Sequence, residues 1–577
     1  MNFRYDKEEE KLVVSSASRI EYHQMKIWLT RHVKGYRFMP AFKMGIWNGQ
    51  QSYFDNGKVN LGLWKECYKA CKEIDVTFNI ENRDEFPINR DVTLESVQEF
   101  CKDFFKYHRV KDKDGNLIPF MPYDYQIETA YKILKNRYCM AEVATSGGKS
   151  LIISIVYFYT LKKLNPDAKL LIIVPSITLV TQFYDDIKSY FYGQNNINKI
   201  YDYEIEIELV NGTLFRKNPS DIIKTNNRGE IKSMFIEETD IIDNISIKRI
   251  SKIKIKEPLR IEEVMSDKPR KPINENPNIY ISTYQSLSKY PKSFFHQFHT
   301  VVVDEAHTCK ANTLTKILEK TFKNAYNRFG VSGTFPPDES LEILSIQSLL
   351  GPKVTEVSAS ELRDKGVITP MEIKSIIMNH NDSEFKQRLD YIKRGGNGKL
   401  SLEMEKSYIH QSEKRMNVIS KIVNKCNNNV LILFHTIEYG HKLLEYLSNN
   451  CPNKEFYYID GSIKNKEREA IKKSMEIVDN NKVKVLIASY MTLSTGVSIK
   501  NLHYLILSDS FKSEQIVIQS IGRLLRLIYN KNKAVIFDLV DIFDPKNLNN
   551  ILYRHYDERK KFYTKRKYPF IEKKINL

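Results

Sequence analysis

A glycine-rich segment beginning at Val143 has the composition of a phosphate-binding loop. It reads Val-Ala-Thr-Ser-Gly-Gly-Lys-Ser, follows an apolar run and precedes a helical pattern that begins near Leu151. Backbone amides and a helix N-terminus converge on an anion in such a turn. Lys149 would reach the β- and γ-phosphates of a nucleotide, and Ser150 would bind Mg²⁺. Because the strict pattern has glycine where Val143 stands, a chance turn is the alternative interpretation of this segment alone. The candidate phosphate-binding residues are Thr145, Ser146, Gly147, Gly148, Lys149 and Ser150.

Two adjacent carboxylates follow a second apolar run. Asp304 and Glu305 come directly after the valines at residues 301–303. At the end of a strand, Asp304 can hold Mg²⁺ through water, and Glu305 can orient and deprotonate an attacking water. The pair would supply the catalytic groups that a phosphate-binding loop lacks.

Two arginines near the end of the chain complete the pattern. Arg523 and Arg526 are three residues apart, so they share one face of a helix. Two guanidinium groups suit the charge that spreads over a γ-phosphoryl group during its transfer. Alone, such a pair more often belongs to a salt-bridged surface helix. After the loop and the carboxylates, in this order, the pair predicts an ATP hydrolase that uses Mg²⁺.

The elements that must position these residues read as two parallel sheets. Short apolar runs alternate with amphipathic stretches from about residue 120, which is typical of strands buried on both faces and joined by helices. The first series of expected strands comprises residues 138–143, 169–174, 279–282, 300–303 and 329–331. The second comprises residues 430–434, 455–459, 484–488, 504–507 and 533–537. The sequence therefore predicts an α/β protein with two tandem parallel-sheet lobes.

Further segments surround and interrupt the lobes. Within the small N-terminal α/β domain we expect a strand at residues 11–16 and helices at residues 19–33 and 63–74. A β-rich insertion at residues 193–276 carries alternating isoleucines and an Asn211-Gly212 hairpin signal, and we interpret its lysines as a solvated strand face rather than a nucleic-acid contact. The predicted domains are residues 1–108 (N-terminal), 109–355 (first lobe), 356–544 (second lobe) and 545–577 (a basic helical tail).

The N-terminal domain contains a segment rich in rings and cations. Residues 35–49 read Gly-Tyr-Arg-Phe-Met-Pro-Ala-Phe-Lys-Met-Gly-Ile-Trp-Asn-Gly. Arg37 and Lys43 are candidate phosphate contacts. For Phe38, Phe42 and Trp47 we favour packing in a small core over stacking on bases, which is the alternative.

Composition limits the class of protein. The 577 residues are 42% hydrophobic and 11% aromatic, which excludes a wholly disordered or disulfide-stapled chain. With 89 Lys and Arg against 71 Asp and Glu, the net charge of +18 favours polyanionic partners. Seven cysteines form no C-x-x-C pair, and no apolar run is long enough to span a bilayer. We therefore expect a cytoplasmic protein with reduced cysteines.

The order of the motifs resembles that of superfamily 2 helicases of the Asp-Glu-Ala-His type, over residues 120–540. The resemblance implies that both lobes are RecA-like, and it implies roles for further residues. Gln126 would read adenine, Gly496 would contact the nucleotide, and Gln519 would belong to the catalytic motif of Arg523 and Arg526. His307, Ser332 and Thr334 would couple the nucleotide to motion. The implied nucleic-acid contacts in the lobes are Ser176, Thr181, Gln182, Thr283, Thr436, Ser489 and Thr495.

More narrowly, the whole chain is similar to the UvsW-type DNA helicases of tailed bacteriophages, because residues 35–49 match a segment of their N-terminal domain. This resemblance adds Trp47 to Arg37 and Lys43 as a nucleic-acid contact. It implies a monomeric ATP-dependent motor, acting in the host cytoplasm, that remodels DNA forks, recombination junctions and RNA–DNA hybrids. Ser520 stands where many superfamily 2 proteins have arginine, so only Arg523 and Arg526 are assigned as arginine fingers.

Two alternatives stay open at this point. The motor motifs do not separate a DNA helicase from an RNA helicase or from a translocase that moves on duplex DNA without unwinding it. In another class, a nucleotide-gated binding module would bind ATP without turnover, but the intact lysine, carboxylates and arginines argue against it.

Overall fold

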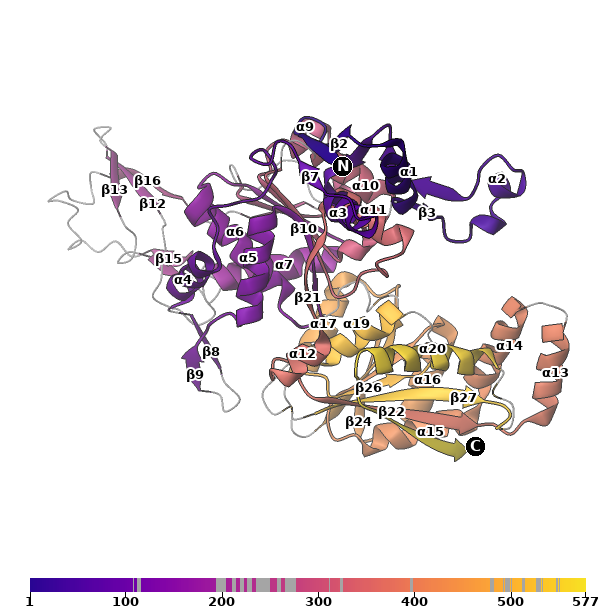
Figure 1. Ribbon diagram of the computed structural model, residues 1–577. Helices are drawn as coiled ribbons and strands as arrows, with labels where there is room; N and C mark the ends of the chain where they lie inside the picture. Colours follow the sequence, from indigo (N-terminus) through magenta and orange to yellow (C-terminus); the bar gives the residue numbers. More distant parts are fainter. Residues whose placement is uncertain are drawn as a thin grey trace. The chain divides into compact units, whose positions relative to one another are not determined.

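In the computed structural model the chain forms two compact units. The first comprises Met1–Val143 and Gly148–Glu356, and the second comprises Ala144–Gly147 and Val357–Leu577. Each unit has its own seven-stranded sheet, drawn in Figure 1. The two α/β lobes predicted from the sequence are therefore confirmed. The structure describes all residues except 107, 112–115, 193–203, 210–213, 218–222, 226–230, 235–249, 257–260, 265–276, 311, 322–324, 395–397, 478–481, 491, 493–498, 500, 511–513, 526–530, 532, 546, 547 and 549.

The sheet of the first lobe brings the predicted strands to one edge. Its order is β17-β18-β11-β19-β20-β10-β21, and every neighbouring pair from β17 to β10 is parallel. Because parallel strands share a carboxyl edge, the segments that follow β10, β19 and β20 emerge side by side. The strands are β10 (Tyr138–Val143), β11 (Leu170–Val174), β17 (Ile261–Val264), β18 (Ile279–Thr283), β19 (Thr300–Asp304), β20 (Asn327–Ser332) and β21 (Lys353–Val357).

Helices cover this sheet and supply the residues that follow the strands. Every residue of β11, β18 and β19 is buried, as expected for strands covered on both faces. The main helices are α4 (Leu94–Phe105), α5 (Asp124–Asn136), α6 (Lys149–Tyr159), α7 (Ile177–Tyr192), α10 (Asn312–Thr321) and α11 (Leu341–Leu350).

The insertion into the first lobe is β-rich, as predicted. β12 (Glu204–Leu209) pairs antiparallel with β13 (Leu214–Lys217) and with β16 (Ile250–Lys256), and β14 (Ile223–Thr225) pairs with β15 (Ile231–Met234). The predicted Asn211-Gly212 turn lies outside the described residues. The predicted end of the insertion at residue 276 needs correction, because β17 lies within that range and pairs with β18 as a partly buried edge strand of the first lobe.

The second lobe repeats the parallel arrangement. Its strand order is β24-β25-β23-β26-β27-β22-β28, with all six neighbouring pairs parallel. The strands are β22 (Met371–Asn379), β23 (Val430–Phe434), β24 (Lys454–Ile459), β25 (Val483–Ser489), β26 (Tyr504–Leu507), β27 (Ala534–Ile542) and β28 (Phe570–Asn576). Helices α15 (Glu413–Lys425), α16 (Ile437–Asn450) and α19 (Glu514–Leu524) are among those joining the strands.

The basic C-terminal segment belongs to the second lobe rather than standing apart as a tail. The expected helix is present as α20 (Ile551–Lys565), but the chain then forms β28, which pairs with β22 at the edge of the sheet. Arg559 of α20 is buried, and its Nη2 lies 2.8 Å from Oδ1 of Asp538 on β27. One of the basic residues of the predicted tail is therefore a buried ion-pair partner that holds α20 on the sheet.

The N-terminal domain shares a core with the first lobe. Its sheet, ordered β5-β6-β2-β1-β7, packs with α1 (Arg19–Trp28) and α3 (Trp64–Glu73). The strands are β1 (Asn2–Asp6), β2 (Lys11–Ser16), β5 (Phe54–Asp55), β6 (Lys58–Asn60) and β7 (Asn79–Ile80). Tyr138 and Leu344 of the first lobe join this core. The strand predicted at residues 11–16 is confirmed, and both predicted helices are present with shorter bounds.

A buried ion pair fastens the domain to the lobe. Glu10 Oε2 lies 2.8 Å from Arg328 Nη2 of β20, and both side chains are almost fully buried. The Tyr138 hydroxyl donates to Glu10 Oε1 at 3.4 Å. Removal of one partner would leave a buried charge uncompensated.

We expect Glu10→Gln to destabilise the first unit by about 3–5 kcal/mol, because Arg328 would lose its buried counter-charge. Thermal unfolding followed by circular dichroism measures the effect. Glu9→Gln is the matched control, since Glu9 is exposed and pairs with the surface lysines Lys11 and Lys58. Equal midpoints for the two variants would contradict the anchoring role of Glu10.

Within the described ranges, no helix combines the length and apolarity needed to cross a membrane. All seven cysteines are buried and free.

Candidate nucleotide site and nucleic-acid contacts

The predicted phosphate-binding loop connects β10 to α6. Gly148 is the N-cap of α6, with φ +76°, and Lys149 is the first residue of the helix. A Cβ atom at Gly148 would lie 2.3 Å from Nε2 of Gln126 in addition to adopting an unfavourable backbone conformation, so glycine is required there. The loop thus ends at a helix N-terminus, where backbone amides and the helix dipole favour an anion.

Gln126, the residue implied to read adenine, lies beside this loop. It is on α5 and 4% exposed, and its Oε1 accepts a hydrogen bond from the backbone N–H of Tyr123 at 3.0 Å. With Oε1 held by Tyr123, the Nε2 atom of Gln126 lies against Gly148. The structure therefore brings Gln126 and the loop together, across 22 residues of sequence.

Lys149 and Glu305 form an ion pair at the carboxyl edge of the sheet. Lys149 Nζ lies 3.1 Å from Glu305 Oε1, and both side chains are mostly buried. Burial alone would raise the pKa of Glu305, but Lys149 and the neighbouring His307 outweigh it and hold this pKa well below its usual range. Glu305 has φ +51°, a left-handed conformation that is uncommon outside glycine. The geometry keeps Glu305 ionised and turned away from the line of β19.

Asp304 is the last residue of β19 and is 4% exposed. Its Oδ1 has no hydrogen-bond partner among the described residues. Burial raises the pKa of Asp304 to about 7, and the nearby Glu305 charge adds to this effect while Lys149 opposes it. A buried carboxylate oxygen without a partner is a natural ligand for a hard cation, directly or through water. The residues present therefore fit the predicted Mg²⁺.

Ser150, the second predicted ligand of Mg²⁺, lies in the first turn of α6. Its hydroxyl is 3.4 Å from that of Tyr190 on α7. Sequence reasoning missed Tyr190, because it stands 40 residues further on in a helix with no recognisable motif. Tyr190 is in reach to orient the Ser150 hydroxyl.

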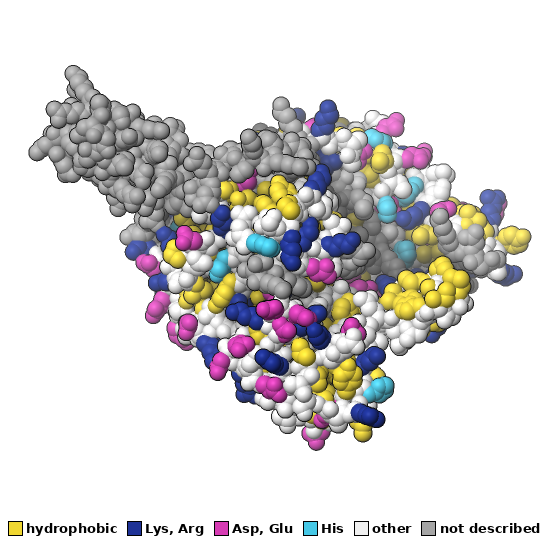
Figure 2. All heavy atoms as spheres, turned by 90° about the horizontal axis from the view of Figure 1, so that it is seen from above, with side chains coloured by type: hydrophobic (Ala, Val, Ile, Leu, Met, Phe, Trp, Pro, Cys, Tyr) yellow, Lys and Arg dark blue, Asp and Glu magenta, His cyan; other side chains and the backbone are white. Residues whose placement is uncertain are grey.

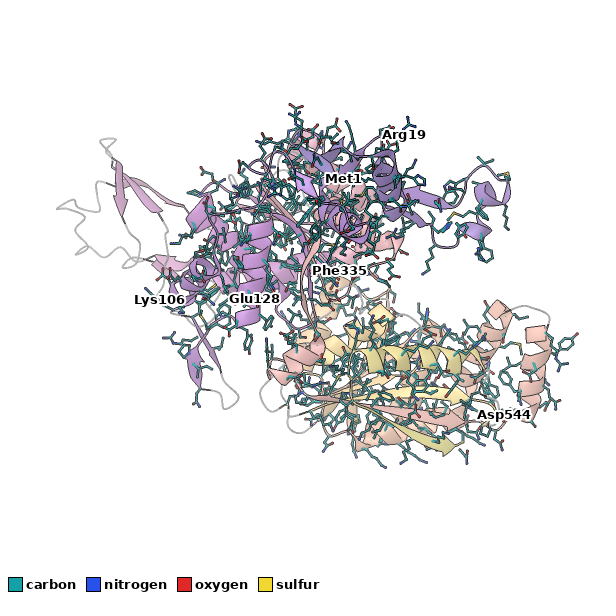
Figure 3. The ribbon with its side chains drawn as sticks, viewed as in Figure 1. Met1, Arg19, Lys106, Glu128, Phe335 and Asp544 are labelled. Carbon is teal, nitrogen blue, oxygen red and sulfur yellow. The ribbon has the colours of Figure 1, made fainter. Side chains whose placement is uncertain are left out.

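The three predicted coupling residues form a chain of contacts that starts at Glu305. His307 Nδ1 lies 3.3 Å from Glu305 Oε2 and 2.8 Å from Ser332 Oγ. The Ser332 hydroxyl donates to the backbone oxygen of Thr334 at 2.8 Å. Figure 3 labels Phe335, the residue after this turn. The contacts connect the candidate catalytic carboxylate to the loop that follows β20.

The implied nucleic-acid contacts of the first lobe lie where β11 and β18 end and on α7, the helix that follows β11. Ser176 follows β11, and Thr181 and Gln182 lie in the first half of α7, with Thr181 exposed. Thr283 ends β18 and is buried, and its Oγ1 accepts from the backbone N–H of Ser286 as the cap of α8 (Tyr284–Leu287). The Thr283 hydroxyl therefore has a structural partner already.

The candidate residues of the second lobe are described less completely. Thr436 is exposed as the N-cap of α16, and Ser489 ends β25 with its hydroxyl 3.3 Å from that of Thr492. Gln519 and Arg523 lie on α19, whose backbone is described there, but their side chains are not. Thr495, Gly496 and Arg526 lie outside the described residues.

The ring-rich N-terminal segment forms an extension between β3 (Thr30–His32) and β4 (Gln50–Ser52), which pair antiparallel. It contains a short 3₁₀ turn (Tyr36–Phe38) and α2 (Pro40–Lys43). Arg37 and Lys43 are exposed, as a phosphate contact requires, whereas the Trp47 Nε1–H donates to the backbone oxygen of Gln50 at 2.8 Å. The packing expected for the rings is wrong for Phe38, which is 81% exposed, because the extension is too small to enclose it.

Net charge alone does not identify the interface. Basic and acidic side chains are interspersed over the face of Figure 2. The described part of the face drawn there has no single basic patch that would mark a nucleic-acid interface.

Three family models match successive parts of the chain. They are described as "DNA helicase UvsW, N-terminal" for residues 10–81, "Type III restriction enzyme, res subunit" for residues 119–337 and "Helicase conserved C-terminal domain" for residues 414–527. The second and third fall on the two lobes, and the first falls on the N-terminal domain that carries the extension.

Relatives and a solved structure agree with these matches. The ATP-dependent DNA helicase uvsW of Enterobacteria phage T4 is 26% identical in an alignment of 571 residues that covers 96% of each chain. A putative helicase of a Sulfolobus islandicus filamentous virus is 29% identical over 257 residues, 44% of each chain. The DNA-bound structure of the ATP-dependent restriction-modification enzyme LlaBIII covers 80% of this chain and 32% of its own, at a TM-score of 0.50 and 12% identity, and supports the fold alone.

Proposed function

We propose that this chain, a superfamily 2 helicase with an N-terminal domain of the UvsW type, uses ATP hydrolysis to move along DNA and to unwind or branch-migrate branched DNA. The observation that carries the proposal is the joint position of Lys149, Asp304 and Glu305 at the carboxyl edge of one parallel sheet. Lys149 pairs with Glu305 at 3.1 Å, and Asp304 immediately precedes Glu305. A nucleotide bound there would meet a phosphate-binding lysine, a cation ligand and a base together.

Each of these residues would have a separate role in hydrolysis. The γ-phosphate would draw Lys149 away from Glu305, because a phosphate competes for the ammonium group. Glu305 would then be free to orient and deprotonate the attacking water. Asp304 and Ser150 would hold Mg²⁺, which supplies charge neutralisation on the β- and γ-phosphate oxygens. The Glu305–His307–Ser332 contacts would pass the loss of the γ-phosphate to the loop after β20.

The second lobe would complete the site with arginines. Arg523 and Arg526, with Gln519 on the same motif, would stabilise the charge on the transferring phosphoryl group. ATP would close the lobes and hydrolysis would release them, and because each lobe grips the backbone separately, the strand would advance. Ser176, Thr181, Gln182, Thr436, Ser489 and Thr495 are the proposed backbone contacts.

DNA, rather than RNA, is the proposed substrate. Similarity to a phage DNA helicase over 96% of the chain supports this choice, and so does the match of residues 10–81 to the N-terminal domain of such helicases. Forks, recombination junctions and RNA–DNA hybrids are the proposed branched substrates, met by a monomer in the host cytoplasm. An RNA helicase or a translocase that does not unwind would share the motor residues and is the second candidate.

ATP turnover on a panel of nucleic acids tests the proposal. We expect single-stranded DNA, duplex, forked DNA, a four-way junction and RNA to stimulate hydrolysis unequally, with the forked and four-way DNAs strongest and also separated into strands. Omission of Mg²⁺ should abolish turnover on all of them. Stimulation by RNA above every DNA would contradict the substrate, whereas ATP binding without any turnover would indicate a gated binding module.

A further inference from the structure

Four large apolar side chains are exposed together on the N-terminal extension. Phe38 is 81% exposed, Met39 37%, Met44 65% and Ile46 75%. They lie within nine consecutive residues, and we call this group the apolar tip. In Figure 1 the extension leads away from α1 and ends at α2, and in Figure 3 the labelled Met1 and Arg19 lie in the body of the domain instead. Exposed apolar side chains gathered at a projecting point indicate a binding surface.

The extension has a defined internal structure. The Tyr36 ring stacks on His32 at 4.4 Å between centroids and packs edge-on against Phe42 at 4.8 Å. Gly49 has φ +78°, and a Cβ atom there would lie 2.2 Å from the Tyr36 ring. The backbone immediately before β4 therefore packs directly against that ring. The Trp47 indole is tied to the Gln50 backbone. These contacts use Tyr36, Phe42 and Trp47 and leave Phe38, Met44 and Ile46 facing solvent.

The positive charge around the tip favours a polyanionic partner. Residues 22–54 contain five Lys or Arg and neither Asp nor Glu. Lys34, Arg37 and Lys43 are exposed close to the tip in sequence. A partner that offers both apolar faces and surrounding negative charge fits this combination, and nucleic-acid bases flanked by phosphates are such a partner.

The domain that carries the tip is packed on the first lobe. The N-terminal domain shares its core with Tyr138 and Leu344 of the first lobe, and the Glu10–Arg328 ion pair is buried at their junction. A side chain on the extension can therefore resist force that the first lobe exerts on a strand. A loosely tethered domain could bind DNA but could not hold bases apart.

On the basis of the proposed function, we infer that the apolar tip stacks on the terminal base pair at the point where two strands separate. Phe38 and Ile46 would cover the base pair that has lost its stacked neighbour, while Arg37 and Lys43 contact the flanking phosphates. The tip would thereby stop the strands from closing again behind each step. Contacts to phosphate alone would not need an apolar surface, so the target is the base face.

Strand separation by the full chain on forked DNA tests this inference, with 2-aminopurine as the first base of the duplex. The test variant is Phe38→Ala with Ile46→Ala. The matched control is Tyr391→Ala with Ile20→Ala, because these residues are 81% and 75% exposed, as are Phe38 and Ile46, and lie outside the tip. The readouts are the base pairs separated per ATP hydrolysed and the rise in 2-aminopurine fluorescence when the base loses its stacking.

We expect the tip variant to separate about tenfold fewer base pairs per ATP, because one base–aromatic stack is worth about that factor or more. It should also show a smaller fluorescence rise per ATP hydrolysed than the wild type and the control. Wild-type values for both readouts in the tip variant would overturn the inference. A wild type that is dimeric, beside a tip variant that is monomeric, would also overturn it, because the tip would then be a contact between two copies of the chain. A wild-type chain that hydrolyses ATP on DNA but separates no strands would overturn the proposed function as well, so the two failures are distinguishable.

Discussion

Glu305→Gln is expected to bind ATP and DNA but to lose nucleic-acid-stimulated hydrolysis by a factor of about 10²–10⁴, the usual contribution of a general base. Glutamine keeps the size of the side chain, and its amide oxygen can still accept a hydrogen bond from Lys149, so the local packing should survive. It cannot take a proton from water. Lys149 also loses its counter-charge, which would favour its contact with phosphate.

Single-turnover hydrolysis and binding of a fluorescent ATP analogue separate the two effects. Glu339→Gln is the matched control, because Glu339 is an exposed glutamate of the same lobe outside the candidate site. Unchanged turnover in Glu305→Gln would remove Glu305 as the base. Loss of ATP affinity together with turnover would indicate that Glu305 has a structural role instead.

The central strands of both lobes could be predicted because they are buried on both faces. Runs such as Leu170–Val174 and Val430–Phe434 are apolar throughout, and only a covered parallel strand requires that composition. The order of strands in each sheet could not be derived from composition, since it depends on crossover connections that leave no local signal.

Strands near the sheet edges were missed for a physical reason. β17, β21 and β28 are edge strands, and β22 lies next to an edge. Several of them alternate apolar and polar residues or carry charges, as in Lys353–Val357 and Phe570–Asn576, because one face or one edge meets water. A search for continuous apolar runs does not detect such strands.

The candidate site was predictable as a set of residues but not as a geometry. The sequence identified Lys149, Glu305 and His307, but not the ion pair between the first two or the left-handed backbone of Glu305. Tyr190 and the exposure of Phe38 also had no sequence signal, because both depend on which elements pack together. The roles of all these residues stay predictions.

Arg523→Ala is expected to reduce ATP turnover by about 10³-fold or more at saturating ATP and DNA, because an arginine that neutralises the transferring phosphoryl group contributes on that scale. The arginine acts on the transition state, so the affinity for ATP should change little. Arg526→Ala should have an effect of the same kind. Arg388→Ala is the control, since Arg388 is an exposed arginine of the second lobe that pairs with the exposed Glu384.

The central claim is that residues from both lobes act on a single nucleotide, and the turnover number of Arg523→Ala tests it most directly. On forked DNA, we expect Arg523→Ala to lose about 10³-fold in turnover number while its affinity for ATP stays nearly unchanged. A turnover number equal to that of Arg388→Ala would mean that the second lobe does not reach the nucleotide, and would contradict the account.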